Sequence, residues 1–71
     1  MKSERASIRA NGLRQEVDLP CSVADFLASY GWKTTQVVVE RNGDVLSRAE
    51  LGNVMLSDGD RLEIIVPVAG G

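Results

Sequence analysis

The 71-residue chain contains no histidine and a single cysteine, and both shortages narrow its chemistry. Without histidine, one chain cannot assemble a Ser-His-Asp or Cys-His catalytic set. One cysteine excludes an internal disulfide framework, so a reducing cytoplasm is the expected compartment. A metal site would need a cluster of carboxylates with one thiol, and no such cluster stands out. The sequence therefore predicts a protein that is not an enzyme and that holds no metal or cofactor of its own.

Long apolar runs and one-sided charge are also missing. No apolar run approaches the roughly 20 residues that span a bilayer, and Met1–Arg5 lead into a predicted strand instead of a signal-peptide apolar region. The eight basic residues are scattered among ten acidic ones, for a net charge of −2, which argues against nucleic acid as a partner. A domain this small buries only about 60% of its unfolded surface, which leaves little interior for a deep pocket. We therefore expect a carrier or interaction module that acts on neither nucleic acid nor membrane.

The first half of the chain predicts a hairpin followed by a helix. Alternating residues 5–10 and 13–19 flank Asn11-Gly12, the strongest short hairpin signal, because both turn residues tolerate positive φ. Leu13, Val17 and Leu19 are expected on the apolar face of the second strand, which Pro20 ends. Ser22 is the expected N-cap of a helix of about 8–9 residues that Gly31 closes. Apolar residues spaced for one helical face define its buried side: Val23, Phe26, Leu27 and Tyr30.

The second half predicts three strands and one helical turn. The run Val37-Val38-Val39 within residues 36–41 is typical of a strand buried on both sides. Asn42-Gly43 turns the chain into a short strand at Val45-Leu46, and residues 47–51 have the pattern of a single helical turn. In the last strand, Leu62, Ile64 and Val66 share one face and Ile65 points to the other. Pro67 ends this strand because it cannot donate to a β-ladder.

This order of elements predicts an α+β fold. The economical solution places the first and last strands side by side at the centre of a mixed sheet of four to five strands. One main helix packs on one face, which is the β-grasp arrangement of ubiquitin-like proteins. We expect residues 1–71 to form one domain with a flexible tail at 67–71.

The end of the sequence, Gly70-Gly71, is the candidate reactive site. Glycine has no Cβ, so such a tail can thread a narrow channel, and Pro67 keeps it out of the sheet. A partner enzyme could then activate the Gly71 carboxylate. Composition alone gives equal weight to a frayed terminus without a role.

Several segments together resemble the ThiS family of thiamine-biosynthesis sulfur carriers, within the ThiS and MoaD group of ubiquitin-like proteins. The similarity covers nearly the whole chain and includes the Asn11-Gly12 hairpin. It is carried further by residues 22–27, by Val37 to Gly43, by Leu56 to Ile64 and by Gly70-Gly71. The Val-Glu-Arg-Asn-Gly piece and the Asp-Gly-Asp turn are its more specific parts.

The resemblance implies a chemical cycle. A ThiF-type enzyme, using its own ATP and Mg²⁺, would adenylate Gly71. Sulfur from a donor enzyme would replace AMP to give a thiocarboxylate, and thiazole synthase would receive that sulfur. Gly71 is then the reacting residue and Gly70 its flexible neighbour, and Pro67, Val68 and Ala69 are expected partner contacts. Ile65 is a further candidate contact because a large apolar residue on the helix-free face can form a docking patch, although single exposed apolar residues are common.

Two other functions remain open at this point. The stretch Pro67-Val68-Ala69-Gly70-Gly71 is also similar to MoaD, the small subunit of molybdopterin synthase, although MoaD-like chains are usually longer. A β-grasp interaction module with an inert terminus is the alternative from a different class.

Three further features have structural explanations that compete with functional ones. Cys21 lies before the helix, whose dipole could lower its thiol pKa, but an incidental small residue is the favoured interpretation. Trp32 is expected to cap an edge of the core rather than to bind a partner. Asp58 and Asp60 are expected to build a tight turn, because one acidic turn supplies too few ligands for calcium.

Overall fold

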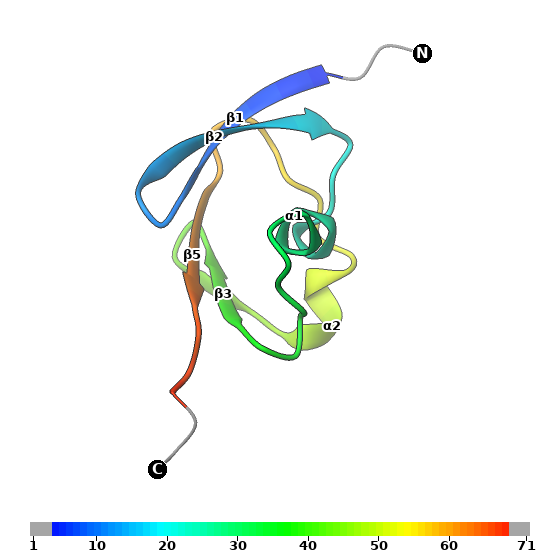
Figure 1. The fold of residues 1–71 in the computed structure, drawn as a ribbon. Helices are drawn as coiled ribbons and strands as arrows, with labels where there is room; N and C mark the ends of the chain where they lie inside the picture. The colour runs from blue at the N-terminus through cyan, green and yellow to red at the C-terminus, as the bar shows by residue number, and fades with distance from the viewer. Residues whose placement is uncertain (1–3, 69–71) are drawn as a thin grey trace.

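The computed structural model describes residues 4–68, which form a five-stranded mixed sheet in the order β2-β1-β5-β3-β4 with two helices on one side (Figure 1). The elements in chain order are β1 (Glu4–Ala10), β2 (Leu13–Leu19), α1 (Val23–Ser29), β3 (Val38–Arg41), β4 (Asp44–Leu46), α2 (Arg48–Leu51) and β5 (Arg61–Ile65). β1 pairs parallel with β5 and all other pairs are antiparallel. The predicted neighbourhood of the first and last strands is therefore confirmed.

The two Asn-Gly turns form as predicted. Asn11 and Asn42 both have a φ of 52°, and the glycines that follow them have φ values of 82° and 90°. These positive angles give the hairpin turn a twist that matches the strands on either side. Consequently β1 pairs with β2 along its whole length, and β3 with β4.

Local side-chain chemistry sets the ends of both helices. The Ser22 hydroxyl accepts a hydrogen bond from the Asp25 N–H at 3.0 Å, and Gly31 follows α1 with a φ of 81°. α1 has seven residues, slightly fewer than predicted. α2 begins with a complete capping box between Ser47 and Glu50, as the predicted helical turn at 47–51 requires. Neither helix has the length that a membrane crossing needs.

The core lies between α1 and the inner face of the sheet. Its buried side chains come from every layer of the fold: Ile8, Val23, Phe26, Leu27, Val37, Val39, Leu51, Leu56 and Leu62. Leu27 and Val39 have no exposed surface. Because α1 covers only the inner face, the outer face of the sheet carries no helix (Figure 1).

Four sequence-based predictions about side-chain burial are wrong. Tyr30, expected on the buried side of the helix, is 54% exposed at the end of α1, where its hydroxyl donates to the Gln15 side chain at 2.7 Å. Val38 lies on the helix-free outer face with 39% exposure, so β3 is not buried on both sides. Leu13, at the edge of the β1–β2 hairpin, is 66% exposed, although Val17 and Leu19 do pack against the core. Val66 lies beyond β5 and is half-exposed, because β3 begins at Val38, the partner of Ile65, and offers Val66 nothing to pair with.

Candidate functional site

Both hairpin turns hold β5, the strand that leads to the C-terminal segment. The Asn11 side chain accepts a hydrogen bond from the Ile64 N–H at 2.7 Å and donates one to the Ile64 carbonyl at 3.2 Å. On the opposite edge, the Asn42 side chain accepts from the Arg61 N–H at 2.9 Å. At these two points the neighbouring hairpin has turned away from β5. The asparagine side chain there makes the hydrogen bonds that a paired strand would otherwise make. β5 is fixed in register up to Ile64 from both sides.

The two family-like motifs meet at the start of β5. The buried carboxylate of Asp60 accepts from Arg41 at 2.9 Å, from the Asn42 side chain at 3.1 Å and from the Ser57 N–H at 2.8 Å. Burial acts to raise the pKa of Asp60, but the Ser57, Arg41 and Asn42 hydrogen bonds outweigh it, and the pKa lies below its usual range. These contacts of Asp60 join the Glu-Arg-Asn-Gly segment to the Asp-Gly-Asp turn, and we call them the Asp60 clasp.

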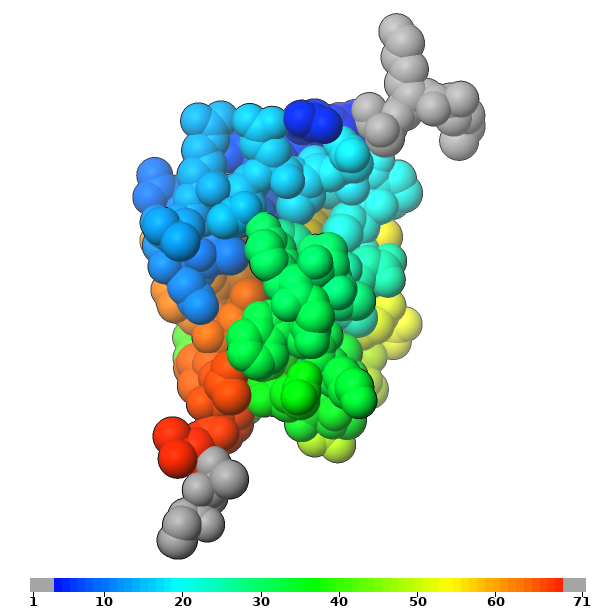
Figure 2. Space-filling view, in the orientation of Figure 1, coloured from blue at the N-terminus to red at the C-terminus, as the bar shows by residue number. Residues whose placement is uncertain are grey.

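The chain leaves the sheet after Ile65. On one side β3 ends its pairing at Val38, and on the other side β1 has already turned at Asn11. Pro67 has no N–H to donate. Pro67 is exposed and Val68 is 91% exposed, and the segment protrudes from the body in the space-filling view (Figure 2). Pro67 and Val68 are therefore accessible from solvent, and their predicted contact with a partner stays a prediction.

An apolar patch lies on the outer face beside this exit. We call Val38, Val45 and Ile65 the outer apolar patch, because they lie on the same face of adjacent strands β3, β4 and β5. Ile65 is 47% exposed and Val45 64%. The sequence pointed to Ile65 but missed Val38 and Val45. The signal for Val38 was its spacing of two from the polar Glu40, which the run of valines obscured.

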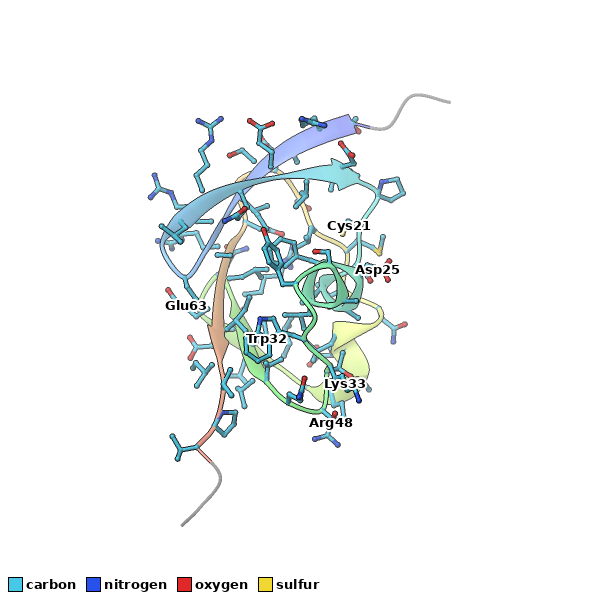
Figure 3. All side chains as sticks on the ribbon, viewed as in Figure 1. Cys21, Asp25, Trp32, Lys33, Arg48 and Glu63 are labelled. Carbon is cyan, nitrogen blue, oxygen red and sulfur yellow. The ribbon has the colours of Figure 1, made fainter. Side chains whose placement is uncertain are left out.

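The structure also shows the surroundings of three other residues that the sequence singled out: Cys21, Trp32 and Asp58. Burial, with a smaller contribution from the charge of Asp25, raises the pKa of Cys21, so the helix dipole does not activate this thiol. Trp32 lies between α1 and β3 (Figure 3) and is 38% exposed, and its expected role as a cap on the core stays a prediction. The Asp60 N–H donates to the Ser57 carbonyl at 3.1 Å and closes the predicted tight turn, and Asp58 accepts from the Ser7 N–H at 2.8 Å, which attaches this turn to β1. Within residues 4–68, no group of acidic or cysteine side chains has a metal-binding arrangement.

Three of the predicted site residues lie outside the described part of the chain: Ala69, Gly70 and Gly71. What the structure supplies is the strand and the exposed segment that lead to them. The roles assigned to these three residues stay predictions.

Comparison with known proteins decides between the carrier families. Residues 6–71 match the family model of the ThiS family. The chain belongs to that family. A crystal structure of a thiamine biosynthesis protein (ThiS) from Geobacter metallireducens superposes with a TM-score of 0.77 at 29% identity, covering 92% of this chain and 99% of that one. This match confirms the predicted β-grasp fold.

Two kinds of relative by sequence agree with the family. The sulfur carrier protein ThiS of Bacillus subtilis is 38% identical over 50 residues, which are 70% of this chain and 76% of the relative. A thiazole synthase of Paramagnetospirillum magneticum is 31% identical over 61 residues, 86% of this chain. This chain spans only about a fifth of that synthase, 19% of its length.

The family match, together with the ThiS relatives, agrees with the predicted sulfur-carrier role in thiamine biosynthesis. It also favours the thiamine role over the MoaD alternative.

Proposed function

We propose that this ThiS-family chain carries its sulfur as a thiocarboxylate on Gly71. The observation that supports the proposal is the abrupt end of β5 at Ile65, after which Pro67 and Val68 extend unpaired into solvent. A rigid strand that ends in an exposed segment can present a terminal group to an enzyme while the domain stays folded.

The chemistry requires an activating partner. A carboxylate is a poor electrophile, so it must first become a mixed anhydride. In the proposed cycle, a Gly71 carboxylate oxygen attacks the α-phosphorus of ATP and pyrophosphate leaves. A persulfide on a donor enzyme, whose outer sulfur derives from cysteine, then displaces AMP and forms an acyl disulfide with Gly71. A thiol attacks the donor's own sulfur in this acyl disulfide, so the thiocarboxylate leaves and the donor ends as a disulfide with that thiol. ATP and Mg²⁺ belong to a ThiF-type enzyme, and the chain binds no cofactor itself.

We propose thiazole synthase as the acceptor of the sulfur. In two proteins named thiazole synthase, from Paramagnetospirillum magneticum and Magnetococcus marinus, a segment similar to this chain makes up about a fifth of the polypeptide. A carrier-like segment that shares a polypeptide with the synthase supports direct contact between the two activities. The cytoplasm, where ATP and reduced thiols are available, is the compartment we assign.

Intact-mass measurement tests the loading step. The chain is incubated with ATP, Mg²⁺, a ThiF-type enzyme and a cysteine-derived sulfur source. We expect a mass gain equal to the replacement of one oxygen by sulfur, located at Gly71 by fragmentation. Modification at Cys21, or no gain with any ThiF-type enzyme of the same genome, would contradict the proposal.

The outer apolar patch is the proposed docking surface for these enzymes. We expect Ile65→Asp to weaken partner binding at least about tenfold, because a charge placed against an apolar interface must be desolvated without a counterion. Thermal unfolding should change little, since the side chain is half-exposed.

Leu13→Asp is the matched control for the Ile65 variant. Leu13 is another exposed apolar residue, but it lies on the β1–β2 hairpin, away from the patch. Affinities of both variants for thiazole synthase and the ThiF-type enzyme are measured by calorimetry. Equal weakening by the two variants would rule out a specific role for Ile65.

A further inference from the structure

The outer face of the sheet groups charges of like sign across its strands. Arg9 on β1 lies opposite Arg14 on β2 and in register with Arg61 on β5. Adjacent strands are roughly 4.8 Å apart, so these three residues, the arginine row, form one line across three strands. Two residues after Arg61 on β5, Glu63 lies opposite Glu40 on β3. We call Glu40 and Glu63 the glutamate pair.

These charges form no ion pair within residues 4–68. The ion pairs there join Arg5 to Glu16 and Asp18, and Arg41 to Asp60. No member of the arginine row or of the glutamate pair takes part. Arg14 donates only to the neutral Ser7 hydroxyl, at 2.9 Å. The contrast with Arg5, which the same hairpin neutralises with two carboxylates, shows that the fold can balance charges on this face.

The carboxylates beside the arginine row are already engaged. The arginines line a surface depression of about 390 Å³ together with Ser7 and the turn at 58–60. Asp58 binds the Ser7 N–H, and Asp60 binds Arg41, Asn42 and the Ser57 N–H. Asp58 makes one side of this depression acidic, but it forms no ion pair with the arginines.

Like charges directly opposite each other on adjacent strands destabilise a sheet. This grouping of like charges therefore lowers the stability of the free protein. Exchanging the charges of Arg61 and Glu63 would relieve the repulsion in both rows, because each residue would then face an opposite charge on the neighbouring strand. The free domain gains nothing from this loss of stability. A partner that supplies the opposite charges would explain why the like charges are grouped on this face.

The outer face is arranged in bands that lead toward the tail. Along β5, Arg61, Glu63 and Ile65 all project from this face, roughly 6.5–7 Å apart. The arginine row, the glutamate pair and the Val38–Ile65 pair thus follow one another in the direction of the chain exit, and Val45 lies opposite Glu40 in the row of the glutamate pair. In Figure 3, Glu63 lies on the side of β5 away from α1. A partner with bands of the opposite sign would bind in only one orientation along this axis.

We infer that these bands orient the thiazole synthase on the sheet face, with an acidic segment of the synthase over the arginine row. This inference rests on the proposed function, because it takes the acceptor enzyme as the partner. Electrostatic complementarity of this kind fixes register and suppresses wrong orientations. Here it would direct the C-terminal segment toward the synthase's active site.

Exchanging the two central charges tests the inference. The double variant Arg61→Glu with Glu63→Arg keeps the net charge and composition of the chain. We expect its affinity for the thiazole synthase of the same genome to fall at least about tenfold, because like charges then meet across the interface. Its melting temperature should equal or exceed that of the unaltered chain, since both rows gain opposite-charge neighbours.

A second exchange away from the outer face is the control. Lys33→Glu with Asp44→Lys also conserves net charge, and its affinity should stay within about twofold because rim charges far from a contact contribute little. Binding is measured by calorimetry with the unloaded chain at two salt concentrations. Equal affinity of the exchanged and unaltered chains, or no binding by the unaltered chain, would overturn the inference. A fall in melting temperature would overturn its electrostatic premise.

Inorganic phosphate distinguishes a docking surface from a small-anion site. Backbone amide chemical shifts of the arginine row are followed by NMR during a titration with millimolar phosphate. Shift changes that saturate would assign the row to a small anion and contradict the proposal, whereas changes that do not saturate support it. Loading of Gly71, read by intact mass on the unaltered chain, is scored separately. A chain that loads while the charge exchange leaves binding unchanged refutes only the inference, whereas a chain that never loads refutes the proposed function.

Discussion

Removing Gly71 should abolish sulfur loading, with a loss of at least about a hundredfold in the rate of thiocarboxylate formation. The deletion leaves a terminal carboxylate on Gly70 but withdraws it by about 3.5 Å, the length of one extended residue. A misplacement of even 1 Å at a reacting centre can cost about a hundredfold. Because β5 is held in register by Asn11 and Asn42, the strand cannot slide forward relative to the rest of the domain to compensate.

A matched pair of variants separates tail length from general damage. Adding one alanine after Gly71 displaces the carboxylate in the other direction and should also prevent loading. Lys33→Gln, in the loop after α1, should load at the unaltered rate. All three proteins are compared by intact mass over time, with thermal unfolding as a check on the fold. Full activity of the shortened chain would favour the interaction module with an inert terminus.

Replacing Asp60 by asparagine should lower the free energy of unfolding by about 2 kcal/mol, the scale of hydrogen bonds to a charged group. The Asp60 carboxylate accepts at both oxygens, from Arg41 and Ser57 at one and from Asn42 at the other. The amide of an asparagine has only one acceptor oxygen, so its NH₂ group must face a donor. Arg41 also loses its counterion. For a domain that is stable by only about 5 kcal/mol or slightly more, this is a large fraction.

The same carboxylate gives a pH signature. The folded-state pKa of Asp60 lies below its ordinary value, so its contribution is complete above the unfolded pKa of about 3.9. The contribution is then lost as pH falls through the lower folded pKa. The stability difference between the unaltered chain and Asp60→Asn should therefore be constant near neutral pH and shrink below about pH 4.

Asp58→Asn in the same turn is the control for this variant. Asp58 is exposed and accepts from the Ser7 N–H, a bond that an asparagine side-chain oxygen can also accept. We expect a change below about 1 kcal/mol, measured by urea unfolding from acid to neutral pH. A similar loss from both substitutions would contradict the central role of the Asp60 clasp.

Residues that act through local chemistry could be interpreted from the sequence. The Asn-Gly turns, the Ser22 and Ser47 caps and the strand break at Pro67 follow from backbone preferences and nearby hydrogen bonds, which are encoded within a few residues. The alternation of Ile64 and Ile65 likewise assigned each to a face of the sheet. These signals were sufficient for the β-grasp fold and for the exposed positions of Pro67 and Val68.

Residues that act across the sheet could not be placed in this way. The sequence marked Asn11 as a turn residue, but its bond to Ile64 spans 53 positions. Arg41 and Asp60 were known as parts of two motifs, and only the pairing of β3 with β5 brought them together. Val38 was misassigned because a run of three valines hides which face each one occupies.

By itself, the sequence determined the order of elements, the caps and turns, and a C-terminal Gly-Gly placed after a strand breaker. The tertiary structure decided how far β5 is held, where the chain leaves the sheet and which side chains share the outer face. The physical reason is strand register. A shift of one residue between strands would move every side chain to the other face, so the arginine row, the glutamate pair and the outer apolar patch exist only once all five strands of the sheet are aligned.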